Sequence, residues 1–240
     1  MRPSNIGWFD FGMLIWSLLT LAFIIQNVWA LIPSILPYPW TQVSLGFSIQ
    51  LATLILIIIS AKYYPRLFDF PVNIKQNSGS YASTQGVLSF LIALPIVWVV
   101  NLSWIGITKL WKQFGILIDL QQQELVKLFA ESRSPLLLVA IIVFGVIIAP
   151  ITEEFIFRAG IYRFLKSKMN ALLALTISAF LFAWVHQNLL AFLPLFLLGL
   201  LLARAYEKTG SIITPIIFHS LFNANSLVIL FMNPEFYLIT

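Results

Sequence analysis

The chain has 240 residues, of which 60% are hydrophobic and only 10% are charged. A water-soluble domain cannot bury that much apolar surface, so the composition excludes a soluble protein and indicates one that crosses a membrane several times. The long, continuous apolar runs favour helices over a β-barrel, whose strands alternate apolar and polar residues. The formal charge of +5 does not indicate nucleic-acid binding, because the basic residues are scattered at the ends of apolar runs. Cysteine is absent from the sequence, which excludes a disulfide framework and a thiol nucleophile.

The sequence predicts about seven membrane-spanning helices, so the expected fold class is an all-α polytopic transmembrane helix bundle. We expect one integral membrane domain, in which residues 1–134 supply the N-terminal helices and loops and residues 135–240 carry the candidate site. In chain order, the predicted spans are Phe11–Ile32, Gln42–Ala61, Val87–Thr108, Pro135–Ile151, Ala171–Gln187, Leu189–Ala203 and Ser211–Met232.

The connections on either side of the third span differ in character. Tyr63 to Gly86 is predicted to be a polar loop, because it contains the turn-forming run Asn77-Ser78-Gly79-Ser80. Leu110 to Arg133 has apolar residues at helical spacing, which predicts a short helix. That helix either lies amphipathically at the membrane interface or packs on the bundle as an ordinary loop helix.

The fourth span has a clear start signal in Ser134-Pro135, an N-cap serine followed by proline at the first helical position. We expect its helix to continue past the membrane to about Lys166. Pro150, late in this span, should kink the helix and free backbone carbonyls. Further on, the short link Gln187-Asn188 predicts that the fifth and sixth spans form a tight antiparallel pair.

The distribution of lysine and arginine predicts the orientation in the membrane. The side that holds the N-terminus has the larger number of basic residues, which places the N-terminus in the cytoplasm and the C-terminus outside. The first side carries Arg2, Lys62, Arg66, Lys75, Arg163, Lys166, Lys168, Arg204 and Lys208, and the opposite side carries Lys109, Lys112, Lys127 and Arg133.

Two acids and a base lie at the end of the fourth apolar run, where each charge costs about 2.5–3.5 kcal/mol on insertion scales. Such groups persist when they pair with one another or line a wet, functional cavity. Glu154 and Arg158 are four residues apart, so they share a helix face and can form an ion pair. Glu153 points about 100° away and has no obvious internal partner. We therefore predict that Glu154 is structural and that Glu153 takes a proton from water, unless the three residues form a charge cluster just outside the bilayer.

Both histidines of the chain lie in later apolar runs. His186 shares a helix face with Phe182, and alone it would be typical of a packing residue or an interface anchor. His219 and Asn223 place an imidazole and an amide side by side, where both can donate hydrogen bonds to a developing oxyanion. Alternatively, these two polar side chains hold helices together. Taken together, a carboxylate, two imidazoles and an amide supply the base, the orienting group and the oxyanion donors that water attack on an amide needs.

Other hydrolase chemistries fit the sequence less well. No aspartate falls inside a predicted span, which argues against an aspartyl intramembrane protease, and no His-Glu-x-x-His zinc motif occurs. We expect no metal and no other cofactor. A zinc site made of Glu153, His186 and His219 stays open as an alternative, because two histidines and one carboxylate form a known catalytic zinc set.

The three motifs together resemble those of the CAAX protease and bacteriocin-processing family of membrane proteins, also called the Abi or CPBP family. The family pattern is Glu-Glu-x-x-x-Arg, then Phe-x-x-x-His, then His-x-x-x-Asn or a relative of it. Here the motifs read Glu153-Glu154-x-x-x-Arg158, Phe182-x-x-x-His186 and His219-x-x-x-Asn223, in that order. The resemblance covers about Pro135 to Asn223. It departs at Ala159, where many members have glycine.

The resemblance implies an intramembrane endopeptidase, similar to a CAAX prenyl protease, in a prokaryotic plasma membrane. Its partners would be the lipid bilayer and a membrane-associated protein or peptide, whose peptide bond is hydrolysed by a glutamate-activated water. On that model residues 135–240 are the catalytic core. Members of the family were long described as metalloproteases, so a description of this protein as one would follow the same usage. The alternatives are a non-cleaving immunity or scaffold protein of the same family and a proton-coupled transporter, which also buries such groups. The resemblance implies that Glu153 and His186 activate water, that His219 and Asn223 stabilise the oxyanion, and that Glu154, Arg158 and Phe182 support the site.

Overall fold

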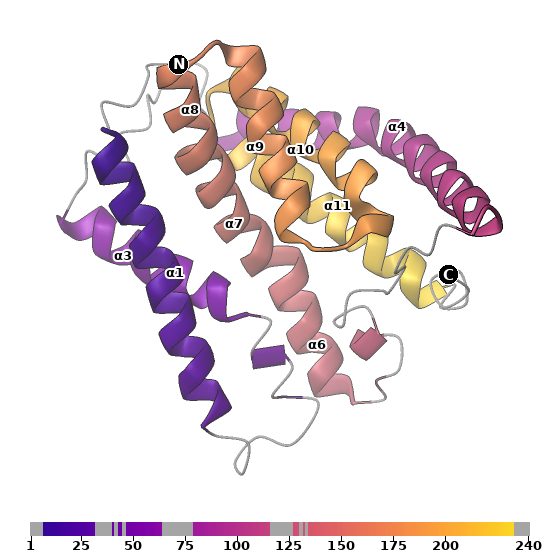
Figure 1. The fold of residues 1–240 in the computed structure, drawn as a ribbon, viewed down its shortest axis with the longest axis horizontal. Coiled ribbons are helices and arrows are strands. Elements are labelled where there is room, and N and C mark those ends of the chain that lie inside the picture. The colour runs from indigo at the N-terminus through magenta and orange to yellow at the C-terminus, as the bar shows by residue number, and fades with distance from the viewer. Residues whose placement is uncertain are drawn as a thin grey trace.

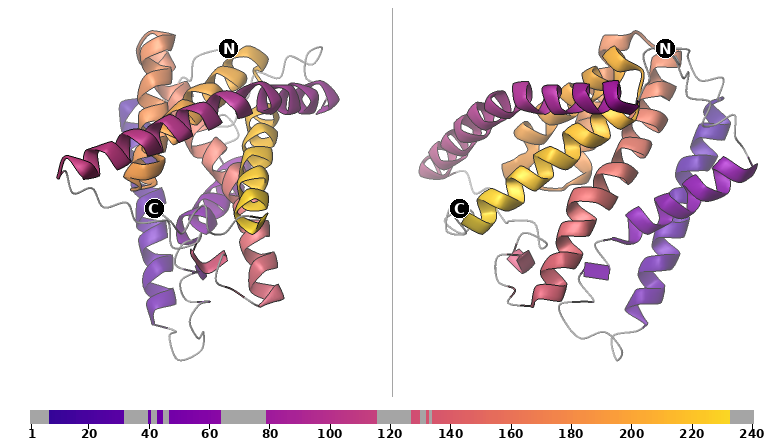
Figure 2. Two further views of the ribbon diagram at one scale, coloured as in Figure 1. Left: turned by 90° about the vertical axis from the view of Figure 1, so that its right-hand side faces the viewer. Right: turned by 180° about the vertical axis from the view of Figure 1, so that it is seen from behind.

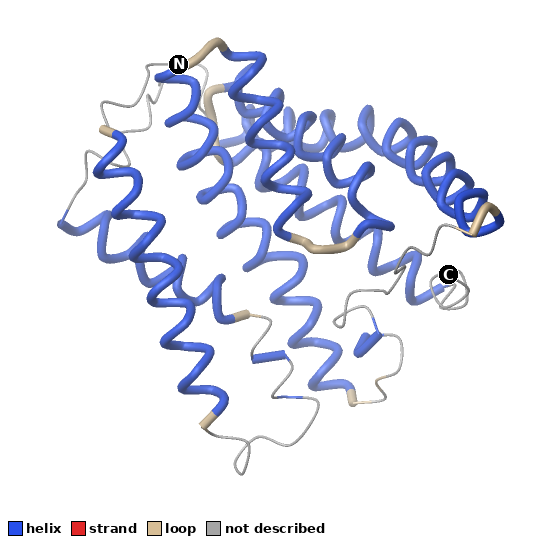
Figure 3. Tube along the Cα trace, in the orientation of Figure 1, coloured by secondary structure: helices blue, strands red, loops and turns tan. Residues whose placement is uncertain are grey.

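The structure is a computed structural model that describes residues 7–31, 40, 43–44, 47–63, 79–115, 127–129, 132 and 134–232. This described part consists of helices joined by short loops and contains no strand (Figure 3). The predicted all-α membrane bundle is therefore confirmed. The elements are α1 (Trp8–Ala30), α3 (Ser48–Tyr63), α4 (Gly79–Gln113), α6 (Pro135–Val143), η2 (Phe144–Ile148), α7 (Ala149–Glu154), η3 (Phe155–Tyr162), α8 (Arg163–Lys168), α9 (Ala171–Val185), α10 (Leu189–Thr209) and α11 (Ile213–Met232).

One continuous helical rod, made of α6, η2, α7, η3 and α8, runs through the middle of the molecule (Figure 1). The pair α1 and α3 lies on one side of this rod, and α4, α9, α10 and α11 lie on the other (Figure 2). On that second side α9 packs against α10, and α11 packs against both α4 and the α7 part of the rod. The rod is therefore the element around which the two halves of the bundle meet.

Within the described residues, five helical segments are long and apolar enough to cross a membrane. Two further apolar helices, Ser48–Ile59 and Ala171–Val185, are shorter. Together they correspond to the seven predicted segments. Large apolar side chains such as Trp16, Phe23 and Ile92 are exposed on the outside of the bundle, which suits a surface that faces lipid tails. The five long segments are Trp8–Val28, Gly79–Trp111, Pro135–Lys168, Leu189–Thr209 and Ile213–Met232.

The predicted polar loop before the third span is wrong at its C-terminal end, because α4 already begins at Gly79. The hydroxyl of Ser83 donates to the carbonyl of Gly79 at 2.7 Å, and that of Thr84 donates to the carbonyl of Ser80 at 2.9 Å. A hydroxyl that donates to the carbonyl four residues earlier has its hydrogen-bond partner within the same helix, so a helix can include such polar residues. The rest of the predicted loop lies outside the described residues.

Most of the predicted short helix between Leu110 and Arg133 also lies outside the described residues. Near its end, Leu128 and Phe129 are buried in one apolar cluster with Leu137 and Ile141 of α6. These two side chains therefore pack on the bundle, as the loop-helix alternative expects of them. The question of an interfacial position for the remaining residues stays open as a prediction.

The start and length of the central rod follow the sequence prediction. The Ser134 hydroxyl accepts a hydrogen bond from the Leu137 N–H at 3.4 Å, and Pro135 is the first helical residue. The rod continues to Lys168, close to the predicted end. Pro150 is the second residue of α7, just beyond the π-helical segment η2, so a wider helical turn precedes the proline.

Helices α9 and α10 form the predicted tight pair around a short turn. Asn188 caps α10, because its side-chain oxygen accepts the N–H of Ala191 at 3.0 Å. The two backbones come close where α10 carries Gly199: a Cβ atom at this position would lie 3.0 Å from the Cα of Ala179. The missing side chain of Gly199 therefore allows the close packing that brings the end of α9 to the site.

Candidate active site

The acidic pair lies on α7, a six-residue α-helical segment between the π-helical segments η2 and η3. π-helical turns are rare overall, but many of those that occur lie at functional sites. They place side chains differently from an α-helix and leave carbonyls available to donors from other elements. One such carbonyl, that of Phe157 in η3, accepts a hydrogen bond from the Ser178 hydroxyl of α9 at 3.1 Å. The irregular rod is thereby tied to the helix that carries His186.

The predicted ion pair between Glu154 and Arg158 is confirmed. Arg158 Nη1 lies 2.9 Å from Glu154 Oε1, and the side chains are 1% and 0% exposed. The second terminal nitrogen of Arg158 donates to the carbonyl of Gly199 at 3.2 Å. The guanidinium also lies over the ring of Phe182, 4.6 Å from its centroid. A charge cluster at the membrane surface would leave these groups solvated, so their burial argues against that alternative.

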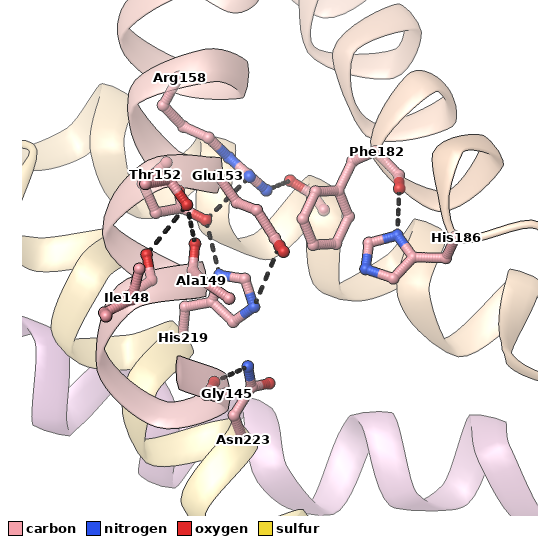
Figure 4. Close-up of polar contacts among 12 residues, drawn as sticks. Gly145, Ile148, Ala149, Thr152, Glu153, Arg158, Phe182, His186, His219 and Asn223 are labelled. Carbon is pink, nitrogen blue, oxygen red and sulfur yellow. Dashed lines mark hydrogen bonds and ion pairs between the residues drawn. The ribbon is translucent and has the colours of Figure 1, made fainter. Parts of the chain in front are cut away.

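The ring of His219 lies between the two glutamates (Figure 4). Its Nδ1 is 2.9 Å from Glu154 Oε1, and its Nε2 is 3.8 Å from Glu153 Oε2. An ionised carboxylate can only accept, so Nδ1 carries the hydrogen and donates it to Glu154. The contact with Glu153 exceeds hydrogen-bond distance. Glu154 therefore holds both Arg158 and His219, and this second contact was not predicted.

Glu153 is the more accessible of the two acids, with its side chain 18% exposed. Its Oε2 atom is buried without a hydrogen-bond partner. Two carboxylates and the single guanidinium of Arg158 leave the group with one net negative charge.

His186 lies at the C-terminal end of α9, where its ring is fixed by the backbone. The N–H of His186 bonds to the carbonyl of Ala183, and the ring Nδ1 lies 2.7 Å from the carbonyl of Phe182. Since a carbonyl oxygen only accepts, Nδ1 carries the hydrogen and Nε2 keeps its lone pair. The Phe182 ring packs against both imidazoles, with centroid distances of 5.0 Å to His186 and 5.7 Å to His219. Both imidazoles thus pack against the same buried phenylalanine, although the described contacts join Glu153 to His219 and not to His186.

Asn223 lies one turn after His219 on α11 and reaches the central rod. Its side-chain nitrogen donates to the carbonyl of Gly145 in η2 at 2.8 Å (Figure 4). The predicted pairing of His219 and Asn223 on one helix face is therefore observed, and both side chains face the rod that carries the acidic pair.

The residues do not fit the alternative zinc site. Among the described residues, no group of three or more His, Cys, Asp or Glu side chains is arranged to hold a metal ion. His186 makes no described contact with Glu153, and its described ring contacts are with Phe182. The set Glu153, His186 and His219 is therefore not assembled as metal ligands.

Sequence reasoning missed the backbone contributions to the site. The carbonyls of Gly199 and Gly145 accept hydrogen bonds from Arg158 and Asn223, and a carbonyl carries no residue signature. Thr152 was also missed. It is fully buried beside the acids, and its hydroxyl lies within hydrogen-bond distance of the carbonyls of Ile148 and Ala149.

Comparison with known proteins bears on this geometry. Residues 135–225 match the family model of the type II CAAX prenyl endopeptidases, described as Rce1-like. This range contains all three motifs and every side chain of the site. This part of the chain is similar to the CAAX protease and bacteriocin-processing family. The match is to a family of proteases, and it includes the residues of the candidate site.

Two curated relatives are similar to part of the chain. The membrane-embedded CAAX protease MroQ of Staphylococcus aureus (strain USA300) is 32% identical over 101 residues, which cover 39% of this chain and 40% of MroQ. An uncharacterized 24.3 kDa protein of Escherichia coli is 33% identical over 99 residues, which cover 39% of this chain and 45% of that protein. The chain thus spans less than half the length of each relative. No solved structure matches it.

Proposed function

We propose that this protein is an intramembrane endopeptidase that hydrolyses a peptide bond of a membrane-associated protein or peptide, with a water activated by Glu153. One observation carries the proposal. Inside a bundle of membrane helices, a partly accessible carboxylate faces an imidazole whose other nitrogen is held by a second, fully buried carboxylate. A fixed imidazole next to an accessible acid is the arrangement that general acid–base catalysis requires.

In the proposed first step, Glu153 takes a proton from water while the water oxygen bonds to the carbonyl carbon of the substrate. The carbonyl π bond breaks, and its electron pair moves onto the oxygen. His186 offers the lone pair of Nε2 as a second acceptor that orients the same water. In the next step the oxyanion collapses, the C–N bond breaks, and the proton held by Glu153 passes to the departing nitrogen.

The oxyanion would be stabilised by His219 and Asn223. Since Glu154 holds the Nδ1 hydrogen of His219, only Nε2 can face an oxyanion, and it donates only when it carries a proton. An imidazolium at this place would lie 2.9 Å from Glu154 Oε1 and 3.8 Å from Glu153 Oε2. The side-chain nitrogen of Asn223 has two hydrogens, of which one bonds to Gly145 and the second remains for the oxyanion.

In this proposal the remaining residues hold the reacting groups in place. Glu154 orients His219, Arg158 neutralises Glu154 and is itself tied to Gly199, and Phe182 separates and supports the two imidazoles. The route uses only side chains and water, so we propose no cofactor. We further propose that the protein lies in a prokaryotic plasma membrane with its N-terminus in the cytoplasm. The orientation is supported by the excess of basic residues on the side of the N-terminus.

The proposal is tested by comparing protein N-termini in membranes of cells that make the wild type or Glu153→Gln at matched levels. Asp10→Asn is a matched control, because Asp10 is an exposed acid on α1 outside the site. We expect new N-termini with the wild type and with Asp10→Asn, and their loss with Glu153→Gln. These termini would also identify the substrate and the cleaved bond. Identical profiles under several growth conditions would overturn the proposal in favour of a peptide-binding protein that does not cleave.

A further inference from the structure

The carbonyl of Gly145 lacks both of the donors that a regular helix supplies. In an α-helix it would accept the N–H of Ala149, but in η2 that N–H donates to Phe144 instead. In a π-helix the donor would be the N–H of the residue five places on, which is Pro150. Proline has no N–H. The π turn and the proline together therefore leave this carbonyl without either of its usual partners.

Asn223 supplies the missing donor from another helix. Its side-chain nitrogen lies 2.8 Å from the Gly145 oxygen. Because a carbonyl oxygen can only accept, the nitrogen and not the oxygen of the amide must face it. Asn223 lies one turn from His219, and Pro150 is buried three residues before Glu153. The bond therefore joins the central rod, which carries the two acids, to α11, which carries His219.

We propose that Pro150 is a positioning residue for Asn223. By having no N–H, Pro150 keeps the Gly145 carbonyl available, and this carbonyl fixes the amide of Asn223. An amide group is planar, so anchoring one of its two N–H hydrogens sets the direction of the other. The inference rests on the proposed function only where it assigns that second hydrogen to the oxyanion. A donor that is already oriented stabilises an oxyanion without reorganisation.

Thermal unfolding of the purified full-length protein in detergent tests the coupling without any substrate. We expect Asn223→Ala to lower the melting temperature by about 2–4 °C, because a carbonyl loses its only donor. In a Pro150→Ala background, Asn223→Ala should lower the melting temperature by less than about half as much. The reason is that the new N–H of residue 150 can donate to the Gly145 carbonyl. Pro95→Ala is the matched control, since Pro95 is an exposed helix proline in α4. In the Pro95→Ala background, Asn223→Ala should lower the melting temperature by as much as it does in the wild type.

Equal costs of Asn223→Ala in the wild-type and Pro150→Ala backgrounds would overturn the inference. If Pro150→Ala does not give folded protein, Asn223→Asp tests the same bond, because a carboxylate cannot donate to the Gly145 carbonyl. We expect Asn223→Asp to melt at least as low as Asn223→Ala, and a melting temperature equal to that of the wild type would contradict the bond.

Kinetics test the positioning role itself. On a substrate found by the N-terminus comparison, Pro150→Ala should lower kcat by about tenfold or more and change KM by less than about twofold, because the oriented donor acts in the transition state. An unchanged kcat would overturn the role in catalysis. If the wild type cleaves nothing, the proposed function fails, and the unfolding experiment still decides whether Pro150 and Asn223 are coupled.

Discussion

Glu154→Gln is expected to lower stability strongly and Glu153→Gln to leave it nearly unchanged, although the two residues are neighbours. Glu154 is fully buried and accepts charge-assisted hydrogen bonds at 2.9 Å from both Arg158 and His219. The glutamine keeps the shape of the side chain and removes the charge, so the buried guanidinium loses its nearest counter-ion. Breaking a buried pair in this way costs about 3 kcal/mol, which corresponds to a fall in melting temperature of roughly 6–12 °C for a chain of this size.

Glu153 has no such partner. Its side chain is 18% exposed, and its contact with His219, at 3.8 Å, is longer than a hydrogen bond. We therefore expect Glu153→Gln to melt within about 2 °C of the wild type. The assay is thermal unfolding of both variants, purified in one detergent. The reasoning is refuted if Glu154→Gln melts like the wild type, or if both substitutions lower the melting temperature equally.

Two further predictions concern the contacts that support the site. Gly199→Ala should destabilise the protein by about 1–3 kcal/mol, because its Cβ would lie 3.0 Å from the Cα and 3.1 Å from the Cβ of Ala179. Thermal unfolding should show little change for Gly106→Ala, whose Cβ would meet nothing within 4 Å, and equal effects of the two substitutions would contradict the close-packing argument. Tyr162→Phe should cost about 0.5–1.5 kcal/mol in the same assay, since the phenol donates to Glu207 at 2.7 Å. A variant as stable as the wild type would show that this bond contributes nothing.

The sequence was sufficient for the helices and for most of the polar side chains near the site. Apolar runs predicted the spans, and the four-residue spacing of Glu154 and Arg158 predicted their ion pair, because both depend on local periodicity alone. The contact between His219 and Glu153 could not be predicted in this way. The described contacts place His219 next to both acids, and this arrangement depends on how α11 packs against the rod.

Two other features depend on the backbone, which sequence patterns do not specify. The sequence predicted that Pro150 would disturb its helix, but the π turn that accommodates it depends on the hydrogen bonds of the whole segment. Likewise, nothing in the sequence marks the carbonyls of Gly145 and Gly199 as acceptors for side chains of other helices. Polar residues near Gly79 were interpreted as a loop for a related reason, since only the structure shows that Ser83 bonds back to its own helix.

The length of α9 has a consequence for the surrounding bilayer. Its 15 residues rise about 22 Å, whereas the hydrocarbon core of a bilayer is about 30 Å thick, and tilting the helix would shorten its reach further. The helix begins just after Lys168, a residue that favours the membrane surface. With the start of α9 at one surface, the turn that carries His186 would end below the opposite surface, and the bilayer beside it would have to thin or admit water. A reaction that consumes water inside a membrane depends on such a path, and here the shortness of one helix brings the edge of the bilayer toward the histidine.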